Sequence, residues 1–191
     1  MTTSKGQSMH GPLLFRPKIF ADDRGFFLES WNQSSWEKCL LQNGQKLNDF
    51  VQDNHSSSSQ GVLRGLHYQL PPYPQGKLVR CVVGEIFDVA IDLRKASSTF
   101  LESVGVYLSS ENFQQLWIPE GFAHGFLTVS SKAEVLYKTT ALWNPQLERS
   151  IRWNDPRLAI QWPFASEPPV LSKKDSKAPL LADLTQSDLF E

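Results

Sequence analysis

Short runs of alternating hydrophobic and polar residues follow one another from residue 13 to residue 162, and Gly, Pro, Asn and Ser residues separate them. This pattern is typical of the strands and turns of a β-sandwich or β-barrel. The clearest predicted strands are residues 77–83, 85–93, 104–108, 124–129 and 134–140. The sequence therefore predicts an all-β fold.

The predicted strand 85–93 shows the alternation most strictly. Bulky residues occupy positions 87, 89, 91 and 93, and they alternate with Ile86, Asp88, Ala90 and Asp92. Because successive side chains point to opposite faces of a strand, the two aspartates are expected to share one face.

One early segment, residues 34–41, indicates a short helix that packs outside the sheets. Ser34 is the predicted N-cap, Glu37 would complete a capping box, and Gly44 follows the predicted end. The serine run 56–59 is interpreted as a loop. No internal repeat or long linker divides the 191 residues, so we expect a single domain, 1–191, with residues 1–11 and 180–191 as tails.

Charge and composition exclude several classes of function. The 19 basic and 20 acidic side chains are mixed along the chain, which indicates no nucleic-acid-binding surface. No secretory signal and no apolar run of membrane-spanning length occur, so no membrane association is expected and a cytoplasmic location is favoured. Cys39 and Cys81 are interpreted as free thiols, as in a reducing compartment.

Polar residues concentrate in a few segments inside or beside the apolar runs, where an unpaired charge is costly. The segments are 22–29 (DDRGFFLE), 51–55 (VQDNH), 63–68 (LRGLHY) with 75–77 (QGK), and 119–126 (PEGFAHGF). They are followed by 137–138 (YK), 148–156 (ERSIRWNDP) and 171–175 (LSKKD). In residues, order and spacing these strings resemble the dTDP-4-dehydrorhamnose 3,5-epimerase family over about residues 11–179. Each motif alone is weak, but seven in order make coincidence improbable.

The resemblance implies a cupin-type jelly roll, also called a double-stranded β-helix, with a few short peripheral helices, in agreement with the predicted strands. It also implies a homodimer and a dTDP-linked 4-keto-6-deoxyhexose as substrate. The implied reaction converts dTDP-4-dehydro-6-deoxy-D-glucose to dTDP-4-dehydro-L-rhamnose by acid/base catalysis without a cofactor.

The residues themselves argue against a cupin metal site. His67 is followed by Tyr68 and Gln69, so the usual His-x-His pair is missing, and Lys77 lies where it would repel a dication. His124 alone remains of that ligand set, so no metal is predicted.

The implied reaction needs a base, an acid on the opposite face of the sugar, and a cation or donor for the developing enolate. The resemblance assigns His67 as base, Asp175 as the carboxylate that orients it, Tyr137 as acid and Lys77 as cation. It implies that the substrate is bound by Arg24, Glu29, Gln52, Asp53, Asn54, Arg64, Lys77, His124, Glu148 and Lys174. Asp88 is a further candidate for the site.

Other interpretations of these residues remain open. A lone histidine or a strand tyrosine is more often structural than catalytic, Arg24 lies in a segment of turn composition, and Glu148 could belong to a surface ion pair. The alternative functions are epimerisation at one carbon only or of another nucleotide-linked 4-keto-deoxysugar, a metal-dependent cupin oxygenase, and a non-catalytic sugar-nucleotide binding module. The last has no need of His67, Tyr137 and Asp175 together.

Overall fold

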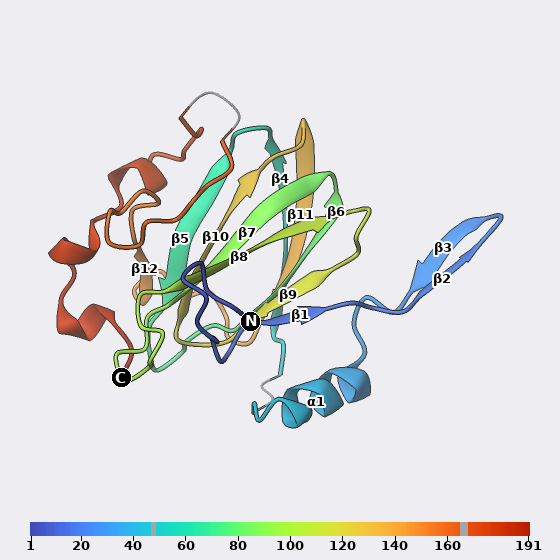
Figure 1. The fold of residues 1–191 in the computed structure, drawn as a ribbon, viewed down its shortest axis with the longest axis horizontal. Helices are drawn as coiled ribbons and strands as arrows, with labels where there is room; N and C mark the ends of the chain where they lie inside the picture. The colour runs from blue at the N-terminus through green and yellow to red at the C-terminus, as the bar shows by residue number, and fades with distance from the viewer. Residues whose placement is uncertain (47–48, 165–167) are drawn as a thin grey trace.

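The computed structural model describes residues 1–46, 49–164 and 168–191. Within them, two five-stranded antiparallel sheets face each other (Figure 1). The first sheet contains, in spatial order, β1 (Leu13–Phe15), β9 (Gln115–Ile118), β6 (Lys77–Val83), β11 (Lys132–Thr139) and β4 (Gln52–Ser59). The second contains β12 (Glu148–Ser150), β5 (Leu63–Gln69), β10 (Phe122–Thr128), β7 (Glu85–Asp92) and β8 (Ser103–Ser109). The predicted all-β jelly roll is confirmed.

The alternation in β7 divides its side chains between two hydrophobic clusters. Ile86 and Ala90 point between the sheets and are buried with residues of β6, β8, β9, β10 and β11. Val89 and Ile91 point outward and are buried beneath the C-terminal segments. Burial of each large aliphatic side chain contributes about 1.5–3 kcal/mol relative to exposure, so both faces of this strand stabilise the fold.

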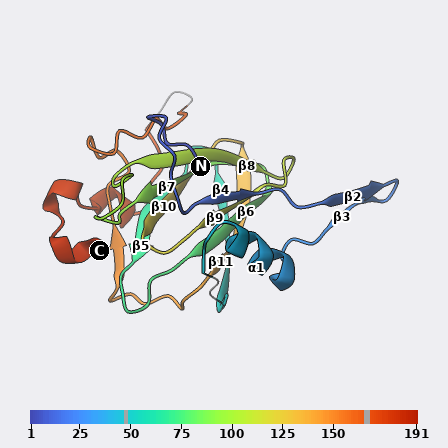
Figure 2. The same ribbon diagram turned by 60° about the horizontal axis from the view of Figure 1, so that its bottom comes forward.

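Helix α1 (Gln33–Gln42) covers the outer face of the first sheet, where Trp36 and Leu40 pack against Leu78 and Trp117 (Figure 2). The prediction of a peripheral helix is confirmed, but its predicted N-cap was wrong. Asn32 is the N-cap, and its side chain accepts a hydrogen bond from the Ser35 amide. Asparagine caps as well as serine does, and the helix therefore begins earlier than predicted. None of the described helices is long and apolar enough to span a membrane.

The serine run 56–59 is not a loop, as predicted, but the last half of β4. Its four residues pair with residues 132–135 of β11 in continuous antiparallel register. Serine is a weak strand former, so composition favoured a loop. Pairing with β11 overrides that preference, because the ladder satisfies the backbone hydrogen-bonding groups of the whole run.

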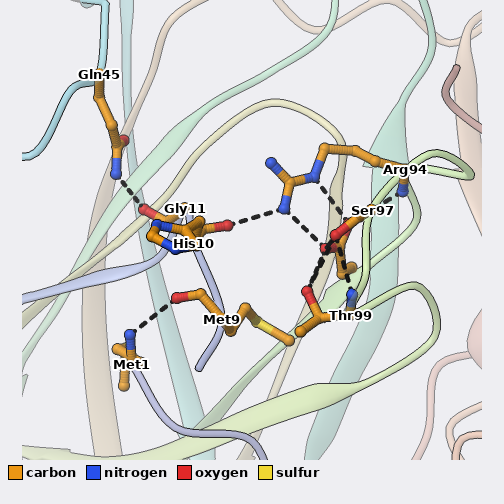
Figure 3. Close-up of polar contacts among 9 residues, drawn as sticks. Met1, Met9, His10, Gly11, Gln45, Arg94, Ser97 and Thr99 are labelled. Atoms are coloured by element: carbon orange, nitrogen blue, oxygen red, sulfur yellow. Dashed lines mark hydrogen bonds and ion pairs between the residues drawn. The ribbon is translucent and has the colours of Figure 1, made fainter. Parts of the chain in front are cut away.

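Both terminal segments, which were expected to be tails, contact the sheets. Met9 is buried in the core between the sheets, and the Met1 ammonium group donates to the Met9 carbonyl. Arg94 donates to the His10 carbonyl (Figure 3). At the other end, the Tyr68 hydroxyl donates to the Asp188 carbonyl. These contacts attach residues from both ends of the chain to the sandwich.

A two-stranded hairpin, β2 (Ile19–Asp22) and β3 (Gly25–Leu28), extends away from the sheets (Figures 1 and 2). Phe20, Phe26 and Phe27 are 51%, 61% and 65% exposed on it. Exposed aromatic residues in such a cluster are typical of a surface that another protein covers.

Candidate active site

A cleft of about 690 Å³ opens between the two sheets. Side chains from both sheets and from the segment before the C-terminus line it. The lining includes Gln52, Asn54, Ser56, Arg64, His67, Gln75, Lys77, His124, Tyr137, Thr139, Trp143, Glu148, Lys174 and Asp175. The cleft therefore brings together most of the residues that the sequence resemblance implied.

Strand register explains why these side chains face one another. His67 of β5 lies directly opposite His124 of β10 in the second sheet. In the first sheet, Thr139 of β11 lies between Gln52 of β4 and Lys77 of β6. Side chains directly opposite across strands point to the same face. The two rows therefore project into the cleft from opposite walls.

Two glycines bring β5 and β10 close together beside His67. Gly65 has φ +134°, and a Cβ atom there would lie 2.6 Å from the Gly125 Cα atom. A Cβ atom at Gly125 would in turn lie 2.8 Å from the Arg64 carbonyl oxygen. The pairing is irregular at this point, between His124 and Phe126. Only glycine fits at these positions, and the bulge sets the direction of the neighbouring side chains.

His67 is paired with Asp175, 108 residues later in the chain. The His67 Nε2 atom lies 2.6 Å from Asp175 Oδ1, and Asp175 is 3% exposed. Burial alone would raise the pKa of the Asp175 carboxyl, but hydrogen bonds from His67, Ser172 and the Gly65 amide lower it. Asp175 is thus a carboxylate that accepts from Nε2, which leaves Nδ1 of His67 as the nitrogen with a free lone pair.

Lys77 and His124 are both buried at the floor of the cleft. The Lys77 Nζ atom donates to the His67 carbonyl at 3.3 Å, and burial lowers the Lys77 pKa to about 8 against the opposing charges of Asp88 and Glu148. Burial also lowers the pKa of His124, although Asp88 at 2.9 Å opposes this. His124 is therefore neutral near pH 7.

Tyr137 faces the cleft from the first sheet. Burial raises the pKa of its hydroxyl, Arg64 lowers it and Glu148 raises it, with burial the largest influence. The phenol therefore stays protonated at neutral pH and can donate a proton. At the edge of the cleft, Lys174 pairs with Glu148 at 2.5 Å.

Polar groups near Arg64 are left without partners inside the protein. Arg64 donates to the Ser58 hydroxyl and the Ser57 carbonyl, and its side chain reaches the cleft. Within the described residues, the Asn54 amide nitrogen and the Ser56 hydroxyl are buried and have no hydrogen-bond partner. Buried polar groups of this kind are costly unless a ligand or water satisfies them.

Three residues of the predicted binding set lie away from the cleft. Asp53 points to the opposite face of β4 from Gln52 and Asn54, and its carboxylate accepts from Lys138 at 3.0 Å. Arg24 and Glu29 lie on and beside the hairpin. Arg24 pairs with Asp22 at 2.5 Å, and Glu29 accepts from Asn32 at 3.1 Å. Within a single chain, these three side chains therefore do not reach the cleft residues.

The cleft also contains residues that the sequence analysis did not assign to the site. Ser56 follows Gln52 and Asn54 on one face of β4, and Thr139 follows Tyr137 on one face of β11. Strand alternation could have found both. Gln75 and Trp143 reach the cleft from loops, where no periodicity applies.

No group of three or more His, Cys, Asp or Glu side chains is arranged to hold a metal ion among residues 1–46, 49–164 and 168–191. His124 contacts Asp88 instead. The two cysteines, Cys39 and Cys81, are free thiols as predicted.

Comparison with known proteins identifies relatives of this chain. The model of the dTDP-4-dehydrorhamnose 3,5-epimerase family matches residues 7–183. A Shigella flexneri protein of that name is 59% identical over 163 residues, which cover 85% of this chain and 87% of the relative. A Salmonella typhimurium protein of the same name is 59% identical over 169 residues, covering 88% and 90%. A crystal structure of a 3,5-epimerase from Legionella pneumophila in complex with dTDP-4-keto-L-rhamnose has a TM-score of 0.89 at 48% identity, covering 94% and 93%.

Proposed function

We infer the chemistry of the cleft from the premise that the chain belongs to the dTDP-4-dehydrorhamnose 3,5-epimerase family. It is an isomerase that converts dTDP-4-dehydro-6-deoxy-D-glucose to dTDP-4-dehydro-L-rhamnose in dTDP-L-rhamnose biosynthesis. The observation that carries our assignment of roles is the His67–Asp175 pair, which lies in the same cleft as Tyr137 and Lys77.

His67 acts as the base in this proposal. Its Nδ1 atom removes a proton from carbon 3 or carbon 5, each of which is acidified by the ketone at carbon 4. Asp175 accepts from Nε2, fixes the ring orientation and stabilises the imidazolium that forms.

Tyr137 acts as the acid, and Lys77 stabilises the enolate between the two proton transfers. When a proton leaves the carbon, negative charge develops on the ketone oxygen, and a nearby ammonium group lowers the energy of that state. Tyr137 then donates its proton to the other face of the same carbon, and the configuration inverts. Before the second carbon reacts, the His67 imidazolium releases its proton to water and the Tyr137 phenolate takes one up from water.

The substrate is held by polar groups around the same cleft. Arg64 is suited to the diphosphate because its guanidinium group can donate to two oxygens at once. Gln52, Asn54, His124, Glu148 and Lys174 line the remaining wall. The Legionella relative binds dTDP-4-keto-L-rhamnose, which is the product expected here.

Arg24 and Glu29 belong to the site only if a second copy of the chain supplies them. The hairpin that carries Arg24 extends away from its own sheets and exposes Phe26 and Phe27. We therefore propose a homodimer in which the hairpin of each chain packs on its partner. The free thiols of Cys39 and Cys81 support a cytoplasmic location.

Hydrogen exchange with solvent tests these roles. Proton NMR of dTDP-4-dehydro-6-deoxy-D-glucose with chelator-treated protein in deuterated water should show loss of the signals of hydrogens 3 and 5. In Tyr137→Phe, exchange should continue while inversion stops, since the base remains and the acid is absent. Equal loss of exchange and inversion would contradict the acid role, and exchange at one carbon only in the unaltered protein would indicate a single-carbon epimerase.

A further inference from the structure

Asp88 is a buried carboxylate behind the cleft residue His124, and the proposed mechanism gives it no role. We propose that Asp88 is a positioning residue for the reaction: it holds His124 as a neutral hydrogen-bond donor, and its uncompensated negative charge keeps Lys77 protonated. This inference rests on the proposed function, because it concerns the cation that faces the enolate.

In the described part of the chain, no cation is hydrogen-bonded to Asp88 to compensate its charge. The side chain is 0% exposed, and both of its oxygens lie near His124 Nε2, at 3.1 and 2.9 Å. Within the described residues, His124 is its one side-chain hydrogen-bond partner. A buried carboxylate without an adjacent cation is costly, so its retention in the core indicates a use for the charge.

His124 cannot neutralise that charge. Burial lowers the pKa of His124, and the positive charge of Lys77 lowers it further, against the opposing effect of Asp88. The neutral ring needs its proton on Nε2 to donate to Asp88, so Nδ1 is an acceptor. Asp88 therefore fixes the tautomer of His124, and the negative charge remains.

Lys77 is the cation on which this charge acts. It is 8% exposed, and its Nζ atom donates to a backbone carbonyl instead of a carboxylate. Burial lowers the Lys77 pKa to about 8, and of the charges that oppose burial, Asp88 is the largest, followed by Glu148. Lys174 acts in the opposite direction and pairs directly with Glu148. Asp88 is thus the principal group that keeps Lys77 charged at neutral pH.

Other titratable groups also face this part of the cleft, and their ionisation can contribute to the pH dependence of kcat. They are Arg64 and His67 of β5, His124 of β10, Tyr137 of β11, Glu148 of β12, and Lys174 and Asp175 near the C-terminus. The pKa of Tyr137 is raised and those of Glu148 and Asp175 are lowered, which removes these three from the range around pH 8. We assign the alkaline side of the rate profile to Lys77, whose pKa of about 8 lies in that range.

The decisive experiment titrates Lys77 directly in the free protein. Carbon-13 NMR of protein labelled at lysine Cε, with the Lys77 signal identified by its loss in Lys77→Arg, gives the midpoint without substrate. Asp88→Asn keeps the side-chain volume and removes the charge. We expect it to lower the Lys77 midpoint by about one pH unit or more, as loss of a nearby opposite charge does. Glu134→Gln, which removes a half-buried carboxylate on β11 that pairs with Lys132, should leave the midpoint unchanged.

The rate profile of the same variants connects the titration to the reaction. In Asp88→Asn the alkaline fall of kcat should move by the same amount, so that kcat at pH 8.5 drops about tenfold more than kcat at pH 6.5, with little change in KM. A uniform fall at every pH would mean a purely structural role and would overturn the proposal. If Asp88→Asn does not fold, Asp88→Glu provides the second test, since it keeps the charge and should keep the Lys77 midpoint within about half a unit.

The two readouts distinguish the failure of this inference from the failure of the proposed function. A Lys77 midpoint that moves by less than about half a unit in Asp88→Asn overturns the inference, whatever the rate does. A midpoint that moves as expected, with an unmoved rate profile, shows instead that Lys77 does not act on the enolate. In that case both the assigned role of Lys77 in catalysis and the positioning role of Asp88 are wrong.

Discussion

Asp88 and Asp92 lie four residues apart on the same face of β7, and both are 0% exposed. Asp92 accepts hydrogen bonds from the backbone and guanidinium group of Arg94 and from the hydroxyls of Ser97 and Thr99. Asp88 has a neutral histidine as its partner. Burial of a carboxylate therefore does not by itself indicate function, whereas incomplete compensation of its charge does.

The two aspartates also belong to different ends of the space between the sheets. Around Asp92, Arg94 donates to the His10 carbonyl (Figure 3). Arg94 also lies over the Phe122 ring, so that the aspartate, through Arg94, helps to fix the N-terminal segment. Asp88 contacts His124, which lines the cleft, and in our proposal its charge acts on Lys77. Strand β7 thus carries Asp92 at an end of structural importance and Asp88 at the end near the cleft.

The largest effect should come from removing the base at the functional end. We expect His67→Ala to lower kcat about 1,000-fold, because proton abstraction loses its catalyst, while the melting temperature stays close to that of the unaltered protein. His55→Ala is the matched control, since His55 is an exposed strand histidine that contacts Glu134. Retention of more than about a tenth of the rate in His67→Ala would exclude His67 as the sole base.

At the structural end, the expected effect is on stability. Asp92→Asn should lower the free energy of unfolding by about 3 kcal/mol, because the new amide group would present hydrogens to donors that now contact a carboxylate. kcat at the optimum pH should remain within about twofold of normal, since Asp92 does not line the cleft. Urea unfolding and steady-state kinetics measure the two quantities, with Asp53→Asn as an exposed control. A large fall in kcat with unchanged stability would reverse the contrast between Asp88 and Asp92.

The strands that create this contrast could be predicted from sequence, because alternation is a local signal. Residues 77–83 match β6 in full, and the shared face of Asp88 and Asp92 follows from period two. Composition was misleading for residues 56–59, because strand pairing with β11 is a long-range interaction. The same alternation, applied to residues 52–54, would have separated Asp53 from its two neighbours.

The candidate site depended more on the resemblance than on the residues themselves. Asp175 lies 108 positions after His67, and no local pattern predicts that a carboxylate from the C-terminal part will meet a histidine of β5. The sequence also did not show which of the two aspartates has its charge compensated by neighbouring groups. Asp88 and Asp92 have equivalent positions in the alternation, and only the surrounding side chains distinguish the compensated carboxylate from the other.

The smallest expected effect is a pH dependence of stability that belongs to Asp92. Burial alone would raise the pKa of Asp92, but hydrogen bonds from Arg94, Ser97 and Thr99 hold it below its ordinary value. A carboxyl group whose pKa is lower in the folded state stabilises the fold fully above its unfolded pKa of about 3.9, and this contribution is lost as pH falls through the folded pKa. The stability difference between the unaltered protein and Asp92→Asn should therefore be complete at pH 6 and smaller by about 1 kcal/mol at pH 3.5. Urea unfolding at the two pH values measures it. A difference that stays constant or grows on acidification would mean that Asp92 does not gain its stability as a carboxylate, and its contrast with Asp88 would then rest on packing instead of charge.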